Sequence, residues 1–298
     1  KSVSLLLAAL MLTGALAGCG SSASTSVGAQ DSSAADTGVS GAITVISRED
    51  GSGTRGAFVE LTGVEEKNAD GQKVDNTTAD AEIANKTDVV LTSVAGNEKA
   101  IGYISLGALN DTVKAVKVDG AEATVDNVRN GSYNLSRPFN IATKGEPTGV
   151  AKDFINFILS KDGQAVVTDN KYIAVDDAAE SFVSDGSSGK VAVGGSSSVS
   201  PVMEKLIEAY KAVNPNASID LQTSDSTSGM TGTMDGTFAI GMASRELKDE
   251  EAAQLTGTVI ALDGIAVVVN PANTIDELSM DQIKSIYVGD ITDWGDLA

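Results

Sequence analysis

Residues 190–213 read KVAVGGSSSVSPVMEKLIEAYKAV, which joins a strand pattern, a Gly/Ser turn and a helix pattern. The run KVAV predicts a strand. Ser200 followed by Pro201 predicts a helix start, because serine caps free backbone N–H groups and proline suits the first helical turn. The apolar residues that follow recur on one helical face, at Val202, Leu206, Tyr210 and Val213. Asn214 and Pro215 predict the end of this helix.

The same alternation of short β-branched runs with helical patterns extends over the chain from Ala42. Strands are predicted at 43–47, 88–93, 101–104, 113–118, 218–221, 237–242 and 259–269. Helices are predicted at 55–61, 150–159 and 281–287, and a polar link at 176–190. Such alternation indicates an α/β fold with a parallel sheet.

The composition limits the possible chemistry. The 298 residues are 42% apolar and 21% charged, which is typical of a globular protein. The chain has no histidine, which excludes Ser-His-Asp and Cys-His catalysis and His-based zinc sites. A formal net charge of −20 argues against nucleic acid as a partner. A single cysteine allows no internal disulfide.

The N-terminal stretch is typical of an export signal. Residues 4–16 (SLLLAALMLTGAL) are apolar, follow Lys1 and are too short for a membrane span. The next residues, Ala17-Gly18-Cys19, complete a segment that resembles the lipobox of bacterial lipoproteins, where the cysteine is lipidated. The alternative for Cys19 is a free buried thiol. We predict a signal peptide with lipobox at 1–19, then a flexible Gly/Ser/Ala-rich tether at 20–41.

Three clusters rich in Ser, Thr and Gly lie where a strand pattern passes into a helix pattern. They are SREDGSGTR at 47–55, GGSSSVS at 194–200 and SDSTSGMTG at 224–232. Free N–H groups and the partial positive charge at a helix N-terminus, with nearby hydroxyls, can hold a small oxyanion. One such cluster alone is usually only a helix cap. Three in one exported chain, together with Arg48 and Arg245, predict an anion site.

The motifs resemble those of one family. SREDGSGTR resembles the signature of the PstS-type phosphate-binding proteins of ABC phosphate transporters. The stretches GGSSSVSPVMEKLIEAY and FAIGMASRELKDEE resemble two further ligand segments of that family. The other similar stretches are VVVNP, IYVGDITDWGDL, IGYISLGAL and RPFNIATKG. The resemblance extends from Ile43 to the end of the chain.

The order of the two halves differs from the usual family order. In the family the GSSSVSP half comes first, whereas here SREDGSGTR comes first and the ITDW segment ends the chain. Each half occurs once, so we predict a circular permutation, with Ala298 near residues 41–43 because the usual order joins these segments. The rival explanation is truncation of a longer tandem protein.

The resemblance implies a two-lobed periplasmic-binding-protein-like fold of type 2, with the ligand between lobes that close around it. We expect one lobe at 42–135, completed by 267–298, and a second lobe at 136–266. The implied phosphate contacts are Arg48, Ser52, Gly53, Thr54, Ser197, Ser198, Ser226, Ser244 and Arg245. The implied supporting residues are Asp50, which would orient Arg48, and Thr227 and Ser228.

Arg245 departs from the family pattern, because some members have an aspartate there. That aspartate accepts a hydrogen bond from protonated phosphate and so excludes sulfate, which carries no proton near neutral pH. Asp50 or Asp225 could supply the acceptor instead, or discrimination could be weaker. Arg245 itself either contacts phosphate or pairs with a nearby carboxylate.

These observations predict an extracytoplasmic lipoprotein that binds inorganic phosphate and delivers it to the transmembrane subunits of an ABC permease. It would act as a monomer, without a cofactor or metal. The alternatives are a binder of sulfate, molybdate or tungstate, and a signalling or adhesion lipoprotein outside transport. An exported enzyme such as a phosphatase is disfavoured, since the sequence has no histidine, no cysteine besides Cys19 and no cluster of metal ligands.

Overall fold

The computed structural model describes residues 39–297. The predicted signal peptide at 1–19, Cys19 and most of the predicted tether lie outside the described residues. The last tether residues are bonded to the folded part, because Val39 N donates to Thr274 Oγ1 at 3.1 Å and Gly41 N donates to Asp293 Oδ1 at 2.9 Å. None of the helices between residues 39 and 297 is both long and apolar enough to cross a membrane.

A nine-stranded mixed sheet runs through the described part of the chain. Its path is β10 (Ala217–Ser224), β9 (Gly189–Ser196), β11 (Ile240–Ala243), β8 (Ser136–Thr143), β12 (Thr256–Val269), β5 (Ala100–Ser105), β1 (Thr44–Arg48) and β4 (Glu82–Ala84), with β6 (Lys114–Ala115) beside β12. The predicted parallel pairing is correct for β9 with β10 and β11, and for β1 with β4 and β5. It is wrong for β8 and β12, which pair antiparallel with each other and with their outer neighbours.

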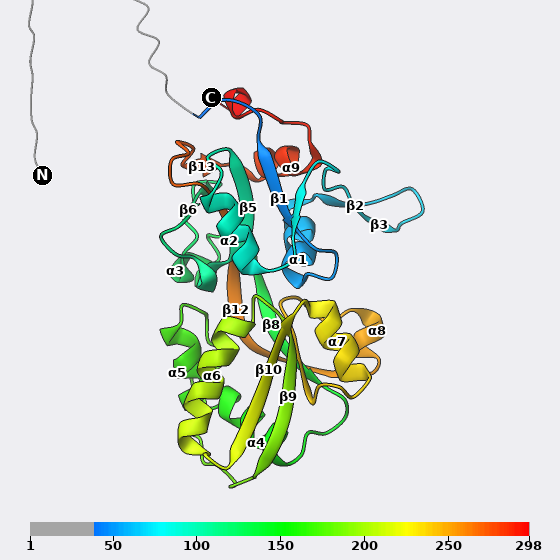
Figure 1. Cartoon of the computed structure of the whole chain (residues 1–298), viewed down its shortest axis with the longest axis vertical. Helices are drawn as coiled ribbons and strands as arrows, with labels where there is room; N and C mark the ends of the chain where they lie inside the picture. Colours follow the sequence, from blue (N-terminus) through cyan, green and yellow to red (C-terminus); the bar gives the residue numbers. More distant parts are fainter. Residues whose placement is uncertain (1–38, 298) are drawn as a thin grey trace, which may run out of the picture. The chain divides into compact units, whose positions relative to one another are not determined.

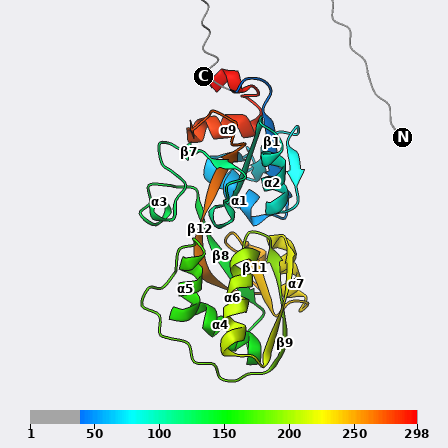
Figure 2. The same cartoon turned by 60° about the vertical axis from the view of Figure 1, so that its left-hand side comes forward.

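Two large hydrophobic cores share this sheet, and a small third cluster of Ala142, Met230, Ala243 and Leu255 lies on β8 and β11. The first core lies between β1, β5 and the end of β12 and the helices α1 (Gly53–Thr62), α2 (Thr87–Ala95) and α9 (Met280–Val288). The second core lies between β9, β11 and the helices α4 (Gly149–Leu159), α5 (Lys161–Asp169) and α6 (Ser200–Val213), which pack together in Figure 2. Strand β12 passes from one core to the other, and β8 starts directly after Leu135 of the first core and enters the second (Figure 1).

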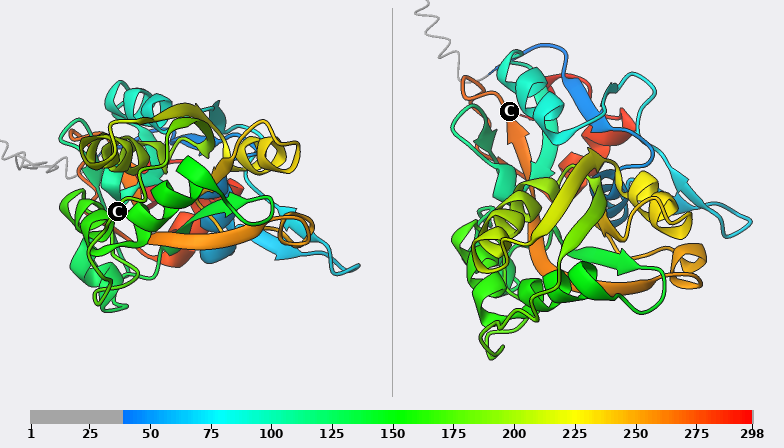
Figure 3. Two further views of the ribbon diagram at one scale, coloured as in Figure 1. Left: turned by 90° about the horizontal axis from the view of Figure 1, so that it is seen from below. Right: turned by 60° about the horizontal axis from the view of Figure 1, so that its bottom comes forward.

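Shorter elements complete the two cores. Helix α7 (Ser226–Met234) lies on β9 and β11. The remaining elements are α3 (Val125–Arg129), α8 (Asp249–Ala252), η1 (Leu106–Ala108), η2 (Trp294–Leu297) and the pair β7 (Lys117–Val118) and β13 (Glu277–Leu278). The hairpin of β2 (Glu65–Lys67) and β3 (Lys73–Asp75) projects beside the first core (Figures 1 and 3). The predicted strand at 113–118 is therefore two short strands, β6 and β7, with different partners.

Helix α6 follows the prediction closely, with one difference at its start. Pro201 lies in the first turn, but Val199 is the N-cap residue and Ser200 is already helical. The Ser200 hydroxyl instead donates to Ser196 O at 3.1 Å and meets Thr223 Oγ1 at 2.8 Å. The serine therefore fastens the helix start to β9 and β10.

The predicted strand at 88–93 is wrong, because this segment is helix α2. A short run such as DVVL does not distinguish a strand from a buried helix by its pattern alone. Val90 and Val94, one helical turn apart, are fully buried. They pack so closely on Gly102 of β5 that a Cβ there would lie 2.8 Å from Val90 Cγ1. Burial of this valine face overrides the preference of β-branched residues for strands.

The C-terminal segment lies against the residues just before β1. The predicted permutation places the end of the chain near these residues. Ile43 N donates to Thr292 O at 2.8 Å, and Trp294 N donates to Gly41 O at 3.1 Å. Trp294 is 1% exposed within the first core, and its Nε1 donates to Lys99 O at 2.9 Å. Ala298 itself lies outside the described residues, but the residues before it occupy the expected place (Figure 1).

Replacing Trp294 by alanine should lower the free energy of unfolding by about 3–5 kcal/mol, the usual cost of emptying a buried aromatic site. Trp294→Phe keeps most of the packing and loses the bond to Lys99 O, so its cost should be smaller, about 1–2 kcal/mol. Urea denaturation at equilibrium measures both. A loss below about 1 kcal/mol in the alanine variant would show that the C-terminal segment adds little to the first core.

Candidate functional site

The first cluster connects β1 to α1. Arg48 is the last residue of β1, and Ser52 is the N-cap residue of α1, where its Oγ accepts from Arg55 N at 3.3 Å. Ser52 and Thr54 are 4% and 1% exposed. The first turn of α1 faces the start of α6, since Thr54 Oγ1 lies 2.7 Å from Ser198 Oγ.

Arg48 is buried, with 2% of its surface exposed, and its guanidinium has two occupied edges. On one edge, Nε and Nη2 donate to the two carboxylate oxygens of Glu49 at 2.8 and 2.7 Å. At the other end, Nη1 lies 3.5 Å from Thr87 Oγ1, and Nη2 donates to Ser197 Oγ at 3.1 Å. Glu49 therefore holds one edge of the arginine, and the other edge, the hydroxyl-facing end, contacts Ser197 and Thr87.

The prediction that Asp50 orients Arg48 is wrong. The Asp50 side chain is 98% exposed and accepts from Arg55 Nη1 at 2.9 Å. Arg55 also donates to Arg48 O at 2.8 Å and pairs with Asp75. Asp50 thus belongs to a surface ion pair, and Glu49 has the role that the sequence assigned to Asp50.

The second cluster brings its hydroxyls to the same place from the second core. Ser198 Oγ lies 2.7 Å from Thr54 Oγ1, which is a direct contact between the two clusters. Ser197 Oγ accepts from Arg48, and Thr87 Oγ1 lies 3.5 Å from Ser197 Oγ and 3.4 Å from Ser198 Oγ. The predicted site residues of the first cluster at 47–55 and the second cluster at 194–200 are therefore in direct contact.

The third cluster and Ser244 lie on the side of the site next to Thr54 and Gly53. Ser226 begins α7, and its Oγ accepts from Ser244 N at 3.1 Å. Ser244 Oγ accepts from Ser196 Oγ at 3.0 Å and lies 3.5 Å from Thr54 Oγ1. Gly53 approaches both serines so closely that a Cβ there would lie 2.4 Å from Ser226 Oγ and 2.8 Å from Ser244 Oγ.

The two predicted supporting residues of α7 have different surroundings. Thr227 N donates to Gly51 O at 3.1 Å, and Thr227 Oγ1 lies 3.3 Å from Arg245 Nη2. Ser228 donates from both N and Oγ to the carboxylate of Asp225, at 2.8 and 2.6 Å. Thr227 therefore touches the first cluster, whereas Ser228 serves to cap α7 through Asp225.

Helices α1, α2, α6 and α7 all begin at this cluster of hydroxyls. Their first turns carry N–H groups that have no carbonyl partner within the helix and a partial positive charge, which together favour an anion. The sequence missed the contribution of α2, because its first residue, Thr87, stood just before a run that was interpreted as a strand. Correct assignment of residues 87–95 as a helix would have found it.

Arg245 pairs with a carboxylate, which is one of the two roles predicted for it. Its Nη1 and Nη2 each donate to Glu251 at 2.8 Å. Burial alone would raise the pKa of Glu251, but bonds from Arg245 and from Lys248 N hold it below its usual value. Sequence reasoning missed Glu251, because three acidic residues stand together at 249–251 and nothing in the motif distinguishes them.

A second buried ion pair lies where β8 and β12 cross between the cores. Arg137 Nη2 donates to Asp263 Oδ2 at 3.0 Å, and the two side chains are 1% and 0% exposed. Asp263 Oδ1 accepts from Ser105 Oγ at 2.9 Å. Burial raises the pKa of Asp263 to about 6, against the lowering effect of Arg137. Neither residue was singled out from the sequence.

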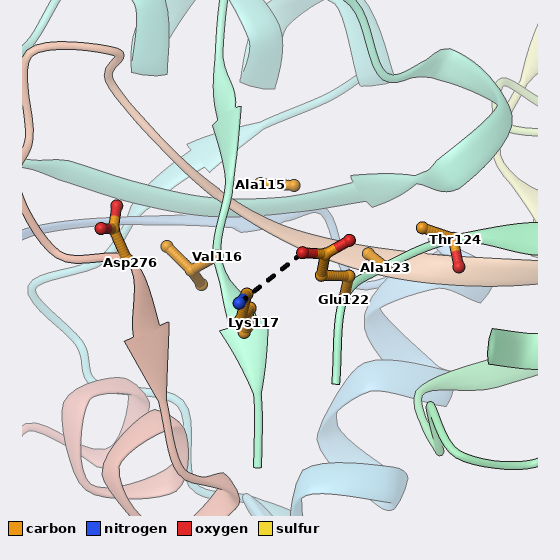
Figure 4. A pocket seen from close by; sticks show the side chains of 7 residues that line it. All are labelled: Ala115, Val116, Lys117, Glu122, Ala123, Thr124 and Asp276. Atoms are coloured by element: carbon orange, nitrogen blue, oxygen red, sulfur yellow. Dashed lines mark ion pairs between the residues drawn. The ribbon is translucent and has the colours of Figure 1, made fainter. Parts of the chain in front are cut away.

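A surface pocket lies apart from this site, beside β6 and β7 (Figure 4). It has a volume of about 330 Å³ and is lined by Ala115, Val116, Lys117, Glu122, Ala123, Thr124 and Asp276. Its lysine lies 3.6 Å from Glu122, so the lining has no excess of positive charge. The pocket shares no residue with the hydroxyl clusters.

Comparisons with known proteins identify the family. The chain matches the family model described as PBP superfamily domain over residues 24–162 and 181–298. It is 51% identical to a protein named phosphate-binding protein PstS 2 of Streptococcus agalactiae over 301 residues, which cover 100% of this chain and 98% of that one. The chain belongs to the PBP superfamily and to its PstS-type phosphate-binding proteins.

Two further relatives support this membership. The PstS 2 protein of Streptococcus pneumoniae is 48% identical over 97% of both chains. A crystal structure titled as a phosphate-binding protein of a phosphate ABC transporter from S. pneumoniae is 50% identical, with a TM-score of 0.69 over 87% of this chain and 100% of that one. This PstS-type chain therefore has the predicted family fold.

The raised pKa of Asp263 predicts a pH dependence of stability. The folded state binds the Asp263 proton more tightly than the unfolded chain, where the ordinary pKa is 3.8. The contribution of Asp263 to the free energy of unfolding is therefore lowest above pH 6, and it rises by about 3 kcal/mol as pH falls below 3.8. Urea denaturation of the wild type and Asp263→Asn between pH 4 and 8 measures this contribution as a difference. A flat difference would mean that Asp263 has an ordinary pKa.

Proposed function

We propose that this protein binds inorganic phosphate between its two cores and delivers it to an ABC permease, as a binding protein and not an enzyme. The observation that carries the proposal is that hydroxyls from both cores meet around the hydroxyl-facing end of Arg48, at the starts of α1, α2, α6 and α7. The names of the relatives, phosphate-binding protein PstS 2, agree with it.

The proposed phosphate contacts are the hydroxyls and backbone N–H groups of the clusters, with Arg48 as the charged partner. Neutral donors at helix starts act at contact range, so they can hold an anion inside a chain of net charge −20. Thr87 joins the predicted contacts. Arg245 acts through its pair with Glu251 and through Thr227, and so positions α7.

The two cores support a division into two lobes, at 42–135 with 267–298 and at 136–266. At the start of β8 the change of core falls between Leu135, just before the strand, and Phe139, and on β12 it falls between Ala261 and Ile265. These crossing points are where hinge motion would open and close the lobes. The buried pair of Arg137 and Asp263 lies at this crossing.

A circularly permuted order of the halves is also proposed. The streptococcal relative matches over the full length, so it has the same order as this chain. The match to the PstS protein of Bacillus subtilis is 37% identical but covers only 45% of this chain and 42% of that one. A match limited to one half is what two chains with exchanged halves would give.

The proposed location rests on the N-terminal sequence. Cys19 behind an apolar export segment would carry a lipid and hold the folded part outside the cytoplasmic membrane, close to the permease subunits. We propose that the protein acts there as a monomer.

The first test is thermal unfolding of the folded part in phosphate-free buffer, with phosphate, sulfate, molybdate or tungstate added separately. A ligand that binds only the folded state stabilises it by about 2.7 kcal/mol at a hundred times its dissociation constant. Stabilisation by phosphate alone is expected. Stabilisation by all four anions would indicate a general oxyanion binder, and stabilisation by none would favour a signalling or adhesion role.

The close approach of Gly53 to the second core gives a sharper test. In Gly53→Ala the new methyl group would collide with Ser226 and Ser244, so we expect phosphate affinity to fall at least about tenfold. Gly56→Ala is the matched control in the same helix, since its nearest neighbour would be Arg245 Cδ at 3.9 Å, an ordinary contact. Isothermal titration calorimetry measures both. Equal affinities in the two variants would place the phosphate elsewhere.

A further inference from the structure

The buried pair of Arg137 and Asp263 differs from the other two arginine pairs near the crossing of the cores. Arg48 and Arg245 each use two nitrogens to bind both oxygens of one carboxylate. Arg137 donates to Asp263 from Nη2 alone, at 3.0 Å, and its Nε and Nη1 have no hydrogen-bond partner among residues 39–297. Both side chains are almost completely buried. Unused donors on a buried arginine need an explanation, since such groups are rare in folded proteins.

The carboxylate of Asp263 is shared, which leaves the charge of Arg137 only partly compensated. Asp263 Oδ1 accepts from Ser105 Oγ at 2.9 Å and from Gly107 N at 3.4 Å, and its Oδ2 accepts from Arg137. Arg137 also lies beside the ring of Phe139, with its Cζ 5.4 Å from the ring centroid, a contact that favours a positive charge. Its surroundings therefore hold Arg137 as a cation without neutralising it fully.

Arg137 lies near the proposed phosphate site. Ser105, which bonds to Asp263, is the last residue of β5, and Arg48 is the last residue of its parallel neighbour β1. These strand ends share the edge at which α/β sheets bind ligands. Burial lowers the pKa of Arg137, Asp263 raises it, and the positive charge of Arg48 lowers it. The two guanidinium groups therefore repel each other, and an anion bound at Arg48 would relieve this repulsion.

We propose that Arg137 is a second charged residue of the phosphate site, which attracts the anion through its charge, and that Asp263 limits this attraction. This inference rests on the proposed function. In a buried region of low dielectric constant a charge acts over a longer distance than in water, and salt screens it little. The pair thus sets the strength of binding, while the hydroxyls and helix starts supply the contacts.

The test compares dissociation constants for inorganic phosphate, measured by isothermal titration calorimetry at pH 8. Burial raises the pKa of Asp263 to about 6, so its carboxylate is ionised at this pH. Asp263→Asn keeps the size of the side chain and an oxygen for Arg137, but removes the compensating charge. We expect this variant to bind phosphate at least about threefold more tightly than the wild type.

Asp153→Asn is the matched control, because it makes the same change at another buried aspartate. Asp153 accepts from Tyr210 at 2.7 Å, and Tyr210 lies about 15 Å along α6 from the helix start at the site. Its replacement should leave phosphate affinity unchanged. A gain in this control equal to that in Asp263→Asn would overturn the inference.

Two variants of Arg137 in the Asp263→Asn background separate the charge of the arginine from its shape. Arg137→Lys keeps the charge and loses the planar fork, so it should keep most of the gain. Arg137→Gln removes the charge and should lose the gain. A pair that serves only the fold would give the tightest binding in the wild type and no difference between lysine and glutamine, and either result would overturn the inference.

The outcome for the inference is distinct from the outcome for the proposed function. Equal or weaker phosphate binding in Asp263→Asn would overturn the inference and leave the proposed function intact. That comparison needs only the wild type and one amide variant, so it stands even where a variant of Arg137 fails to fold. Failure of the wild type to bind phosphate would overturn the proposed function itself.

Discussion

A backbone N–H in the first turn of a helix has no carbonyl partner within that helix. The site depends on these N–H groups, because four helices begin around it. Helices α1 and α2 of the first core, α6 of the second core and α7 of the small third cluster bring their first turns to one place. The contact between Thr54 and Ser198, with hydroxyl oxygens 2.7 Å apart, joins the two sides. The small residue Gly53 also lets the start of α1 approach Ser226 and Ser244 closely.

Paired arginines explain how an acidic protein can contain such a site. Each of the arginines near the crossing of the cores has its own carboxylate: Arg48 with Glu49, Arg137 with Asp263, and Arg245 with Glu251. An unpaired buried charge costs far more than a paired one, so these carboxylates make burial of the guanidinium groups tolerable. The attraction for an anion then comes from the dipoles of the helix starts and from the hydroxyl-facing end of Arg48. The net charge of the protein therefore does not determine whether an anion binds.

The local chemistry of the site could be predicted from sequence, and its tertiary pairing could not. A serine or glycine before a helix pattern is a local signal, so the clusters at 47–55, 194–200 and 224–232 were found. The start of α2 was missed because DVVL has the pattern of a strand until its packing on Gly102 is known. Whether Glu49 or Asp50 orients Arg48 depends on the direction in which these two adjacent side chains point, which the motif does not specify. Glu251 meets Arg245 only after the chain turns from β11 into α8.

Because these signals are local, the proposed exchange of the two halves would matter little to the site. Each contributing unit is a strand end followed directly by a helix start, as in β1 with α1 or β9 with α6. What joins the units is tertiary: β8 and β12 cross between the cores, and Trp294 and Thr292 bond to the segment before β1. A chain opened at that last contact keeps every unit and every crossing intact. Permuted and usual orders can therefore form one and the same cluster of helix starts.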